Sequence, residues 1–218
     1  MSETSDVAEI TRPYHHGDLK QTLIDAACRH IASGGTEKLS LRALAREAGV
    51  SPTAPYRHFS TKNSLLAAIA YEGFSELQTC LDTICEQKIS DPYERWVKLG
   101  VTYVNYAVEN PVKYHLMFGD VLADFTAYEN LQKSVETAFA LVARELNQAK
   151  EEGFVSEAPF EELAAYVWSC LHGLANLIVN KRRRLEFPDE TLGISVIHYL
   201  TQNVEKIMRR VIQGLSIA

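Results

Sequence analysis

The chain has 218 residues, of which 46% are hydrophobic and 23% charged, and a net charge of −6 at pH 7. This length suffices for one large or two small domains, and the low content of Gly and Pro fits a globular helical protein. We expect no run of apolar residues to reach membrane-spanning length, and the acidic, polar start MSETSDVAEI does not have the pattern of a signal peptide. A cytoplasmic location is therefore expected.

Charge is distributed unevenly along the chain. Residues 11–70 contain eight basic and four acidic side chains, a net charge of +4, whereas residues 1–10 carry −3 and residues 71–218 carry −7. A basic segment attached to an acidic remainder is expected of a DNA-binding domain joined to a domain that does not bind DNA. Because the excess is small, shape and specific contacts must add to the electrostatic attraction.

The N-terminal segment predicts a tail, an arm and a first helix. Residues 1–11 are expected to be disordered, and Arg12 and Tyr14 lie in a short arm that could contact phosphate. His15 and His16 are adjacent, and neighbours in sequence rarely bind one ion, so no metal site is expected there. The first helix is expected from Asp18 to the Gly34-Gly35 pair, with an inner stripe made of Leu19, Leu23, Ala26, Ala27, His30 and Ile31.

The stretch LRALAREAGVSPTAPYRHF, residues 41–59, predicts two short helices joined by a tight turn. Ser40 is a candidate N-cap for the first of them, and Gly49 ends it where a left-handed backbone is needed. We expect Val50 to be buried, Ser51 to cap the second helix and Pro52 to occupy its first position. One apolar face of the first helix is formed by Leu41, Leu44, Ala45 and Ala48.

Two short helices with this turn are typical of a helix-turn-helix, whose second helix enters the DNA major groove. The alternative is an ordinary helical hairpin in an all-α core. The surface residues favour DNA, because almost all of them are basic or hydrogen-bonding. The candidate DNA-binding residues are Arg12, Tyr14, Ser40, Arg42, Ser51, Thr53, Ala54, Tyr56, Arg57, His58 and Lys62.

This stretch resembles the DNA-binding domain of TetR-type (tetracycline-repressor-like) transcriptional regulators. The matching residues are the LxxLAxxAGVS run of residues 41–51, followed by Tyr56, His58, Phe59, Lys62, Leu65 and Leu66. The resemblance implies a three-helix DNA-binding domain, expected over residues 12–66. Pro55 departs from the family, which more often has an aliphatic residue there, and its missing N–H predicts a short recognition helix.

The rest of the chain, residues 67–218, predicts a larger helical domain, so the fold class is all-α. Lys62 opens a helix that is expected to run to about Lys88, and its ammonium at the helix N-terminus could contact a DNA phosphate. Further helices are expected over residues 93–108, 112–119, 126–153, 160–182 and 188–214. The basic run of residues 181–184 is explained by favourable cations at a helix C-terminus.

The segment from Trp168 to Gly173 carries a second resemblance, to the TetR C-terminal domain type named for Trp, His and Gly. Packing alone could explain the motif, with Trp168 and His172 in contact one helical turn apart and Gly173 permitting a close helix crossing. The resemblance implies regulation by a small effector. Together with the aromatic residues between Trp96 and Phe125, it gives the candidate ligand-binding residues Tyr103, Tyr106, His115, Met117, Phe118 and His172. An aromatic stripe that simply fills the core is the alternative.

The last two predicted helices have broad apolar faces that could pair across a two-fold axis, and the resemblance implies a homodimer. The candidate dimer residues are Leu163, Val167, Leu171, Leu174, Ile197, Leu200, Val204 and Ile207. An intrachain core is the alternative. Cofactor and metal sites are not expected, because the four cysteines lack the paired spacing of a zinc site; they are Cys28, Cys80, Cys85 and Cys170. They are expected to be reduced core residues, with redox sensing as the alternative.

The expected function is therefore that of a transcriptional regulator, and of a repressor because the family is mostly repressive. Its dimer would bind a palindromic operator and leave it when a small effector binds the C-terminal domain. A factor controlled by a protein partner, or a purely architectural DNA binder without an effector, is the alternative. An enzyme is not expected, because the sequence contains no phosphate-binding Gly-rich loop, no HExxH and no GxSxG.

Overall fold

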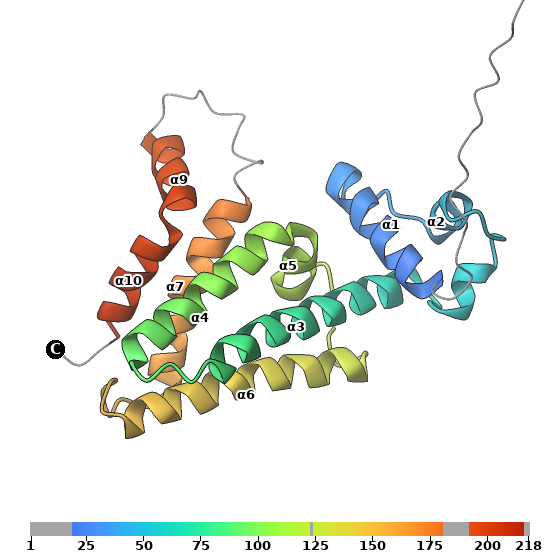
Figure 1. The fold of residues 1–218 in the computed structure, drawn as a ribbon. Coiled ribbons are helices and arrows are strands. Elements are labelled where there is room, and N and C mark those ends of the chain that lie inside the picture. Colours follow the sequence, from blue (N-terminus) through green and yellow to red (C-terminus); the bar gives the residue numbers. More distant parts are fainter. Residues whose placement is uncertain (1–18, 123, 181–191, 216–218) are drawn as a thin grey trace, which may run out of the picture. The chain divides into compact units, whose positions relative to one another are not determined.

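The computed structural model describes residues 19–122, 124–180 and 192–215, which form helices joined by turns (Figure 1). The expected all-α fold class is confirmed. The chain divides into two compact units, Met1–Lys62 and Asn63–Ala218. The predicted tail of residues 1–11, the arm with Arg12 and Tyr14, and the basic run of residues 181–184 lie outside the described residues.

The first unit contains the helices α1 (Leu19–Gly34) and α2 (Leu41–Glu47) and the 3₁₀ helix η1 (Ala54–Arg57). The expected apolar face of α2 is confirmed, and it forms the small core of this unit with α1. Of the expected inner stripe of α1, Leu23, Ala26 and Ala27 are buried, whereas Leu19, His30 and Ile31 are half-buried. The buried residues of the two helices are Leu23, Ile24, Ala26, Ala27, Leu41, Leu44 and Ala45. Gly49 follows α2 with φ of +67°, the left-handed conformation that its position requires.

The second helix of the predicted helix-turn-helix differs from its expected form. It is not an α-helix beginning at Pro52 but a single 3₁₀ turn, η1, with Pro55 buried at its start. Ser51 caps no helix, since its Oγ lies 3.2 Å from Oγ1 of Thr53. Pro55 cannot donate a backbone hydrogen bond, which explains why this element is short.

Two smaller expectations in this region also need correction. Ser40 stands at the N-cap of α2 with an extended backbone, but its side chain makes no capping hydrogen bond. Val50 is half-buried rather than fully buried. Both residues keep their expected places in the turn, so the correction concerns contacts and not topology.

The second unit begins within α3 (Lys62–Glu86), whose first residue closes the first unit. It continues with α4 (Pro92–Glu109), α5 (Pro111–Phe118), α6 (Glu129–Glu151) and α7 (Phe160–Val179), all within a few residues of the predicted bounds. The last predicted helix, residues 188–214, is wrong as a single element. It consists of α9 (Leu192–Gln202) and α10 (Val204–Gln213), separated at Asn203.

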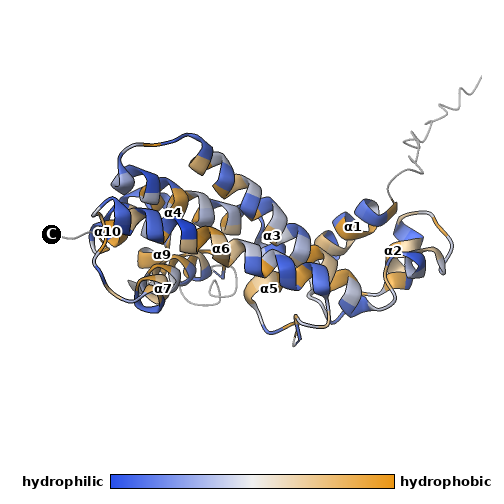
Figure 2. Ribbon diagram, turned by 90° about the horizontal axis from the view of Figure 1, so that it is seen from below, coloured by the Kyte–Doolittle hydropathy of each residue, from blue (hydrophilic) through white to orange (hydrophobic). Residues whose placement is uncertain are grey.

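Helix α4 lies at the centre of the second unit, in contact with α5, α7 and α10, while α7 also packs against α6 and α9 (Figure 1). In Figure 2 hydrophilic and hydrophobic residues alternate along the helices, so that each has an apolar side. The inner side of α4 is the one expected from the sequence. It consists of Trp96, Leu99, Gly100, Tyr103, Val104 and Ala107, all of which are buried.

Helix α7 corrects the expectation that no run reaches membrane-spanning length. Among the described residues it is the one helix whose length and composition would allow it to cross a membrane. Its Leu163, Val167 and Leu174 are nevertheless buried by the surrounding helices. Packing in the second unit therefore accounts for part of the apolar composition of α7, while Tyr166, Trp168 and Leu177 of this helix stay exposed.

Gly100 allows α4 to pack closely against α7 and α10. A Cβ atom at this position would lie 2.7 Å from Sδ of Met208 and 3.1 Å from Cδ2 of Leu171. Met208 is completely buried, so its side chain has little room to move. We expect Gly100→Ala to lower the free energy of unfolding, measured in urea, by about 1–3 kcal/mol because of overpacking.

Gly173 on α7 is the matched control. The expectation that it permits a close helix crossing is wrong for the single chain, because a Cβ atom there would meet nothing within 4 Å. Gly173→Ala is expected to preserve stability or raise it by up to about 1 kcal/mol, since alanine favours the helix. Equal losses in the two variants would contradict the close-packing explanation at Gly100.

Candidate functional site

The surface of α2 and η1 carries cations that no described side chain neutralises. The side chains of Arg42, Arg46 and Arg57 are exposed and make no hydrogen bond or ion pair within the described part of the chain. Tyr56 is 47% exposed, and His58 is exposed with its ring 6.3 Å from that of Phe59. Free guanidinium groups and hydrogen-bonding rings on one short segment are suited to phosphate oxygens and base edges.

The single acidic residue on α2 and η1, Glu47, already has partners on α1. Glu47 accepts a hydrogen bond from Arg29 at 2.9 Å and contacts Nε2 of His30 at 2.6 Å, both on α1. Hydrogen bonds from Arg29 and then His30 hold the pKa of the Glu47 carboxyl below its usual value. The carboxylate thus joins α2 to α1, and its hydrogen bonds are made with Arg29 and His30 and not with the free arginines of α2.

The other predicted DNA-binding residues lie near this surface with different exposures. Ser40, Ser51 and Thr53 are exposed, and Ala54 is half-buried. Lys62 is engaged within the first unit, since its Nζ donates to the backbone oxygen of Thr36 at 3.3 Å. This bond links the turn after α1 to the start of α3, a structural role that sequence reasoning missed.

An aromatic cluster in the second unit surrounds His172 of α7. Nδ1 of His172 lies 2.9 Å from the hydroxyl of Tyr114 on α5 and 3.2 Å from the hydroxyl of Tyr103 on α4. The ring of Phe118 lies 5.1 Å from that of His172, between centroids, and that of Trp168 lies 5.9 Å away. Side chains from three helices thus converge on one imidazole.

The cluster continues on both sides of Phe118 and Trp168. Phe118 also contacts the ring of Phe74 on α3 at 5.4 Å. Trp168 contacts Phe139 of α6 at 5.5 Å in an edge-to-face arrangement, and both of these side chains are 46% exposed. The cluster is therefore buried at Phe74 and open at Trp168 and Phe139. We call these seven residues the His172 cluster: Phe74, Tyr103, Tyr114, Phe118, Phe139, Trp168 and His172.

Only half of the predicted ligand-binding residues belong to the His172 cluster, namely Tyr103, Phe118 and His172. Tyr106 instead donates to Glu76 at 3.1 Å, and His115 contacts Asn180 at 3.0 Å. The third exception, Met117, is buried, and its Sδ would lie 2.6 Å from a Cβ atom placed on Gly73.

Sequence reasoning did not assign Phe74, Tyr114, Phe139 or Trp168 to the ligand site. The expected contact between Trp168 and His172 is present, and it was the available signal for Trp168. Tyr114 lies four residues before Phe118, so one face of α5 carries both. No comparable signal marked Phe74, because its contact depends on how α3 packs against α5.

Burial controls the protonation of the polar groups in the His172 cluster. It raises the pKa of Tyr114 to about 12, and burial followed by the nearby Tyr114 raises the pKa of Tyr103 further. Burial lowers the pKa of His172 below its ordinary value of 6.5. At neutral pH the cluster therefore contains a neutral imidazole and two neutral hydroxyls.

This pKa shift predicts a pH dependence of stability. Between pH 6.5 and the lower folded-state pKa of His172, the unfolded chain binds a proton that the folded chain does not. Stability should therefore fall as the pH decreases through that window. We expect a smaller decrease in Tm for His172→Gln than for the wild type between about pH 7 and pH 5.

The acidic side chains change the stability of the protein in a lower pH range than His172 does. Glu47 and Glu152 have pKa values lowered from 4.5 by hydrogen bonds, from Arg29 and Arg95 respectively, so the stability that they contribute is lost only at lower pH. Differential scanning fluorimetry of both proteins over the pH range provides the measurement. Parallel Tm curves for the two proteins would contradict the assignment to His172.

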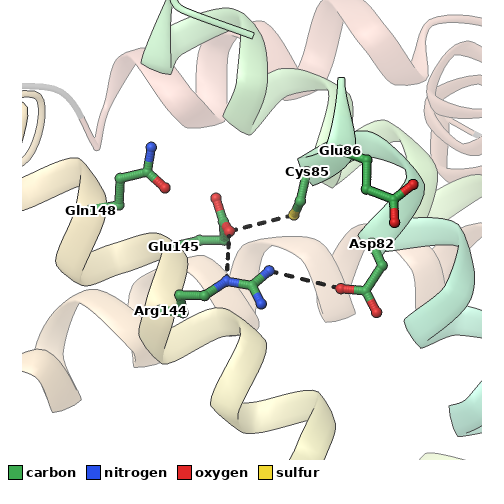
Figure 3. Close-up of a pocket in the computed structure, with 6 residues that line it drawn as sticks. All are labelled: Asp82, Cys85, Glu86, Arg144, Glu145 and Gln148. Atoms are coloured by element: carbon green, nitrogen blue, oxygen red, sulfur yellow. Dashed lines mark hydrogen bonds and ion pairs between the residues drawn. The ribbon is translucent and has the colours of Figure 1, made fainter. Parts of the chain in front are cut away.

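A polar groove, separate in its lining residues from the His172 cluster, lies between the end of α3 and α6. It forms a cavity of about 430 Å³ lined by Asp82, Cys85, Glu86, Arg144, Glu145 and Gln148 (Figure 3). Glu145 accepts from Nε of Arg144 at 3.2 Å and from Sγ of Cys85 at 3.4 Å. Burial and the Glu145 charge raise the pKa of the Cys85 thiol, which disfavours the reactive thiolate.

A neighbouring cavity of about 300 Å³ contains a buried ion-pair network. Arg95 of α4 and Glu145 are 4% and 3% exposed, with Nε of Arg95 lying 3.4 Å from Oε2 of Glu145. Arg95 also donates to Glu152 at 2.5 Å and to the backbone oxygen of Ile89 at 3.1 Å. Nε of Arg95 and Oε2 of Glu145 are buried and have no hydrogen-bond partner among the described residues, so only the ion pair between them compensates these two atoms. The network joins α4 to α6.

Half of the predicted dimer residues are buried within the single chain. Leu163, Val167, Leu174 and Ile197 are buried in its core, as the alternative interpretation proposed. The remaining four, Leu171, Leu200, Val204 and Ile207, are half-buried, and their role in a dimer stays a prediction. Other large apolar side chains on α7 and α9 are exposed by 36–48%, namely Tyr166, Trp168, Leu177, Val196 and Tyr199.

Two family profiles match the chain, one around the helix-turn-helix and one in the second unit. Residues 23–69 match bacterial regulatory proteins of the tetR family, and residues 96–194 match the tetracyclin repressor-like C-terminal domain. The first profile includes α2 and η1 with the free arginines. The second includes Tyr103, Tyr114, Phe118 and His172.

Similar proteins from two bacteria agree with these matches. An HTH-type transcriptional regulator of Mycobacterium tuberculosis is 24% identical over 120 residues, 55% of this chain and 51% of that protein, so the match spans about half the length of that relative. The uncharacterized HTH-type transcriptional regulator YobS of Bacillus subtilis is 25% identical over 187 residues, 85% of this chain and 92% of that protein.

A solved structure from Rhodococcus sp. RHA1, of a protein with unknown function, is 29% identical with a TM-score of 0.71 and covers 94% of this chain and 100% of that chain. Both halves of the chain thus match the same type of protein, at the N-terminal helix-turn-helix and in the helical C-terminal unit. The chain belongs to the TetR family of DNA-binding transcriptional regulators.

Proposed function

We propose that this TetR-family regulator acts as a repressor, whose dimer binds a palindromic operator and releases it when a small effector binds at the His172 cluster. The observation that supports DNA contact most strongly is the set of unpaired arginines on α2 and η1, namely Arg42, Arg46 and Arg57. Their charges remain available because Glu47, the nearest acid, is held by Arg29 and His30. Each free guanidinium can replace a counterion on a phosphate.

A dimer is supported by the apolar side chains that stay exposed on the last helices. Tyr166 and Leu177 of α7 and Val196 and Tyr199 of α9 are each between 36% and 48% exposed. Two copies that bury these side chains across a two-fold axis would also place two helix-turn-helix segments on one palindrome. We therefore assign the dimer surface to these four side chains, which lie beside the half-buried residues expected from the sequence.

Leu177→Glu is expected to convert the dimer into a folded monomer, because it places a charge in the proposed interface without disturbing the core. Sedimentation velocity would show a shift to half the mass, and circular dichroism would show unchanged helix content. Glu161→Ala, which alters an exposed acidic side chain in the first turn of α7, is the control and should remain dimeric. If the Leu177→Glu protein sedimented like the wild type, this surface would not be part of the dimer interface.

The effector part of the proposal is supported by the polar groups inside the His172 cluster. A core made only for packing would not need the hydroxyls of Tyr103 and Tyr114 to converge on Nδ1 of His172. Phe118 connects this group to Phe74 on α3, and α3 is continuous in sequence with the DNA-binding unit through Lys62. An effector that favours one packing of Phe118 would shift α3, and operator affinity would change by about 5–150-fold.

A two-stage experiment tests this function. Differential scanning fluorimetry against a set of small apolar and charged metabolites should find compounds that raise Tm by mass action. Gel-shift assays should then show that these compounds reduce binding to a DNA site that the protein selects. Compounds that fail to change DNA binding, combined with a protein partner that does change it, would favour the partner-controlled alternative.

A further inference from the structure

Among the described residues, the imidazole of His172 has two partners at one nitrogen and none at the other. Nδ1 faces the hydroxyls of Tyr114 at 2.9 Å and Tyr103 at 3.2 Å. Nε2 has no hydrogen-bond partner among the described residues. The ring is only half-buried, and it lies beside Trp168, which is 46% exposed at the open end of the cluster.

The two hydroxyls determine which nitrogen carries the proton. An unprotonated imidazole nitrogen accepts through one lone pair, and the nearer hydroxyl, that of Tyr114 at 2.9 Å, is a good donor to it. The competing partners of Tyr114 are the backbone oxygen of His172, which is farther away at 3.4 Å, and the hydroxyl of Tyr103, with which it shares a hydrogen bond. With Tyr114 as the donor, Nδ1 is the acceptor, and the proton of the neutral ring lies on Nε2.

The surroundings of His172 are uncharged. Its ring contacts are made by Tyr114, Phe118 and Trp168, and its hydrogen bonds by the two tyrosines, with no charged side chain among these described contacts. Burial keeps both tyrosines in the hydroxyl form. A charged ligand group placed here would lose its hydration without gaining a counterion.

We propose that the effector is an uncharged aromatic compound with a hydrogen-bond acceptor, such as a carbonyl oxygen, which accepts the free Nε2–H of His172 while its ring packs beside Trp168. This inference rests on the proposed effector control and specifies the chemical class of the ligand. Tyr114 and Tyr103 act as positioning residues, because they hold Nδ1 as the acceptor and thereby place the donor on Nε2.

The tautomer can be measured directly in the full-length protein without a ligand. Two-dimensional ¹H–¹⁵N spectra of histidine-labelled protein at neutral pH should show His172 protonated at Nε2 and unprotonated at Nδ1. Its signals are assigned by their loss in His172→Gln. In Tyr114→Phe the preference for the Nε2–H form should weaken. A wild-type ring protonated at Nδ1 would overturn the proposal.

Binding is tested with four probes that share a benzene ring: acetophenone, ethylbenzene, benzoate and benzylammonium. Titration calorimetry and Tm shifts should show the tightest binding for acetophenone, which alone combines neutrality with a carbonyl acceptor. Loss of one hydrogen bond should weaken ethylbenzene relative to acetophenone by about five- to tenfold. Tighter binding of benzoate or benzylammonium, or equal binding of ethylbenzene, would overturn the proposed class.

A pair of variants at His172 locates the contact. The side-chain amide nitrogen of glutamine can occupy the place of Nε2, whereas that of asparagine corresponds to Nδ1. His172→Gln should therefore keep acetophenone affinity within about threefold, and His172→Asn should lose about five- to tenfold. Equal affinities in two variants that fold like the wild type would show that Nε2 is not the contact.

The outcomes separate this inference from the proposed function on which it rests. If none of the four probes binds, the assigned ligand class is wrong, but effector control survives when a metabolite from the wider screen still releases DNA. If no small molecule changes DNA binding, effector control itself fails. A ligand that releases DNA and binds His172→Asn as tightly as the wild type would place the effector elsewhere in the second unit.

Discussion

Replacing Tyr56 by alanine is expected to weaken binding to the operator by about 1–3 kcal/mol, while binding to unrelated DNA changes little. Tyr56 is 47% exposed on η1, where its hydroxyl and ring are free to meet base edges. Arg42→Ala should behave differently, because an exposed guanidinium contacts phosphate oxygens without regard to sequence. It should weaken binding to all DNA and reduce the salt slope by about one unit.

Fluorescence anisotropy with operator and scrambled duplexes, at several salt concentrations, provides the measurement. Lys133→Ala is the matched control, because it removes a cation from α6 in the second unit, where Lys133 pairs with Glu129 at 2.5 Å. The control should bind both duplexes like the wild type. If Tyr56→Ala and Arg42→Ala also bound like the wild type, the DNA-binding surface would not be the one formed by α2 and η1.

The largest loss of stability is expected from Arg95→Ala, by about 3–5 kcal/mol. The substitution would leave Glu145, which is 3% exposed, without its buried counterion, and it would also remove the bond to Glu152. As a counterion Glu145 would keep only the exposed Arg144, and a buried carboxylate that loses its buried counterion is costly because burial deprives it of hydration. Urea unfolding followed by circular dichroism measures the change.

A double variant shows whether charge or packing causes this loss. Arg95→Met combined with Glu145→Leu removes both charges and should recover most of the stability, since apolar side chains often replace buried ion pairs without penalty. Arg209→Ala is a comparison on the surface, where the pair with Glu94 is exposed to solvent, and its effect should be much smaller. A double variant as unstable as Arg95→Ala would contradict the electrostatic explanation.

Much of the fold could be predicted because local signals agreed with the final packing. The apolar periodicity of Leu41, Leu44 and Ala45 identified the buried side of α2, and Gly49 marked the left-handed turn. Asp91 and Asn110, each followed by proline, placed the start of α4 and the boundary between α4 and α5 within one residue or two.

The failures occurred where long-range packing decided the structure. The apolar run near residue 203 suggested one helix, but the backbone breaks at Asn203 and separates α9 from α10. The faces assigned to a dimer include Leu163 and Val167, which α4 and its neighbours already cover. Sequence periodicity shows that a face is apolar, but it cannot show whether the same chain or a second copy buries it.

The candidate DNA surface was predictable as a set of residue types, whereas its detailed contacts were not. The resemblance identified Tyr56, His58 and Lys62, but only the structure showed Lys62 bonded to Thr36 and Glu47 neutralised by α1. For the same reason, only three of the seven residues of the His172 cluster were among the predicted ligand-binding residues. Its members come from α3, α4, α5, α6 and α7, and no local pattern specifies which aromatic rings meet.

Selection of bound DNA from a random duplex pool tests the central claim most directly. A dimer with one DNA-binding surface per chain should enrich a palindrome whose half-sites lie about one helical turn apart, or a multiple of that spacing. Selection repeated with Leu177→Glu should lose the paired half-sites, and selection with Tyr56→Ala should relax the preferred bases within each half-site. A wild-type pool that shows no enriched sequence, or only single unpaired sites, would contradict the account of a dimeric operator-binding repressor.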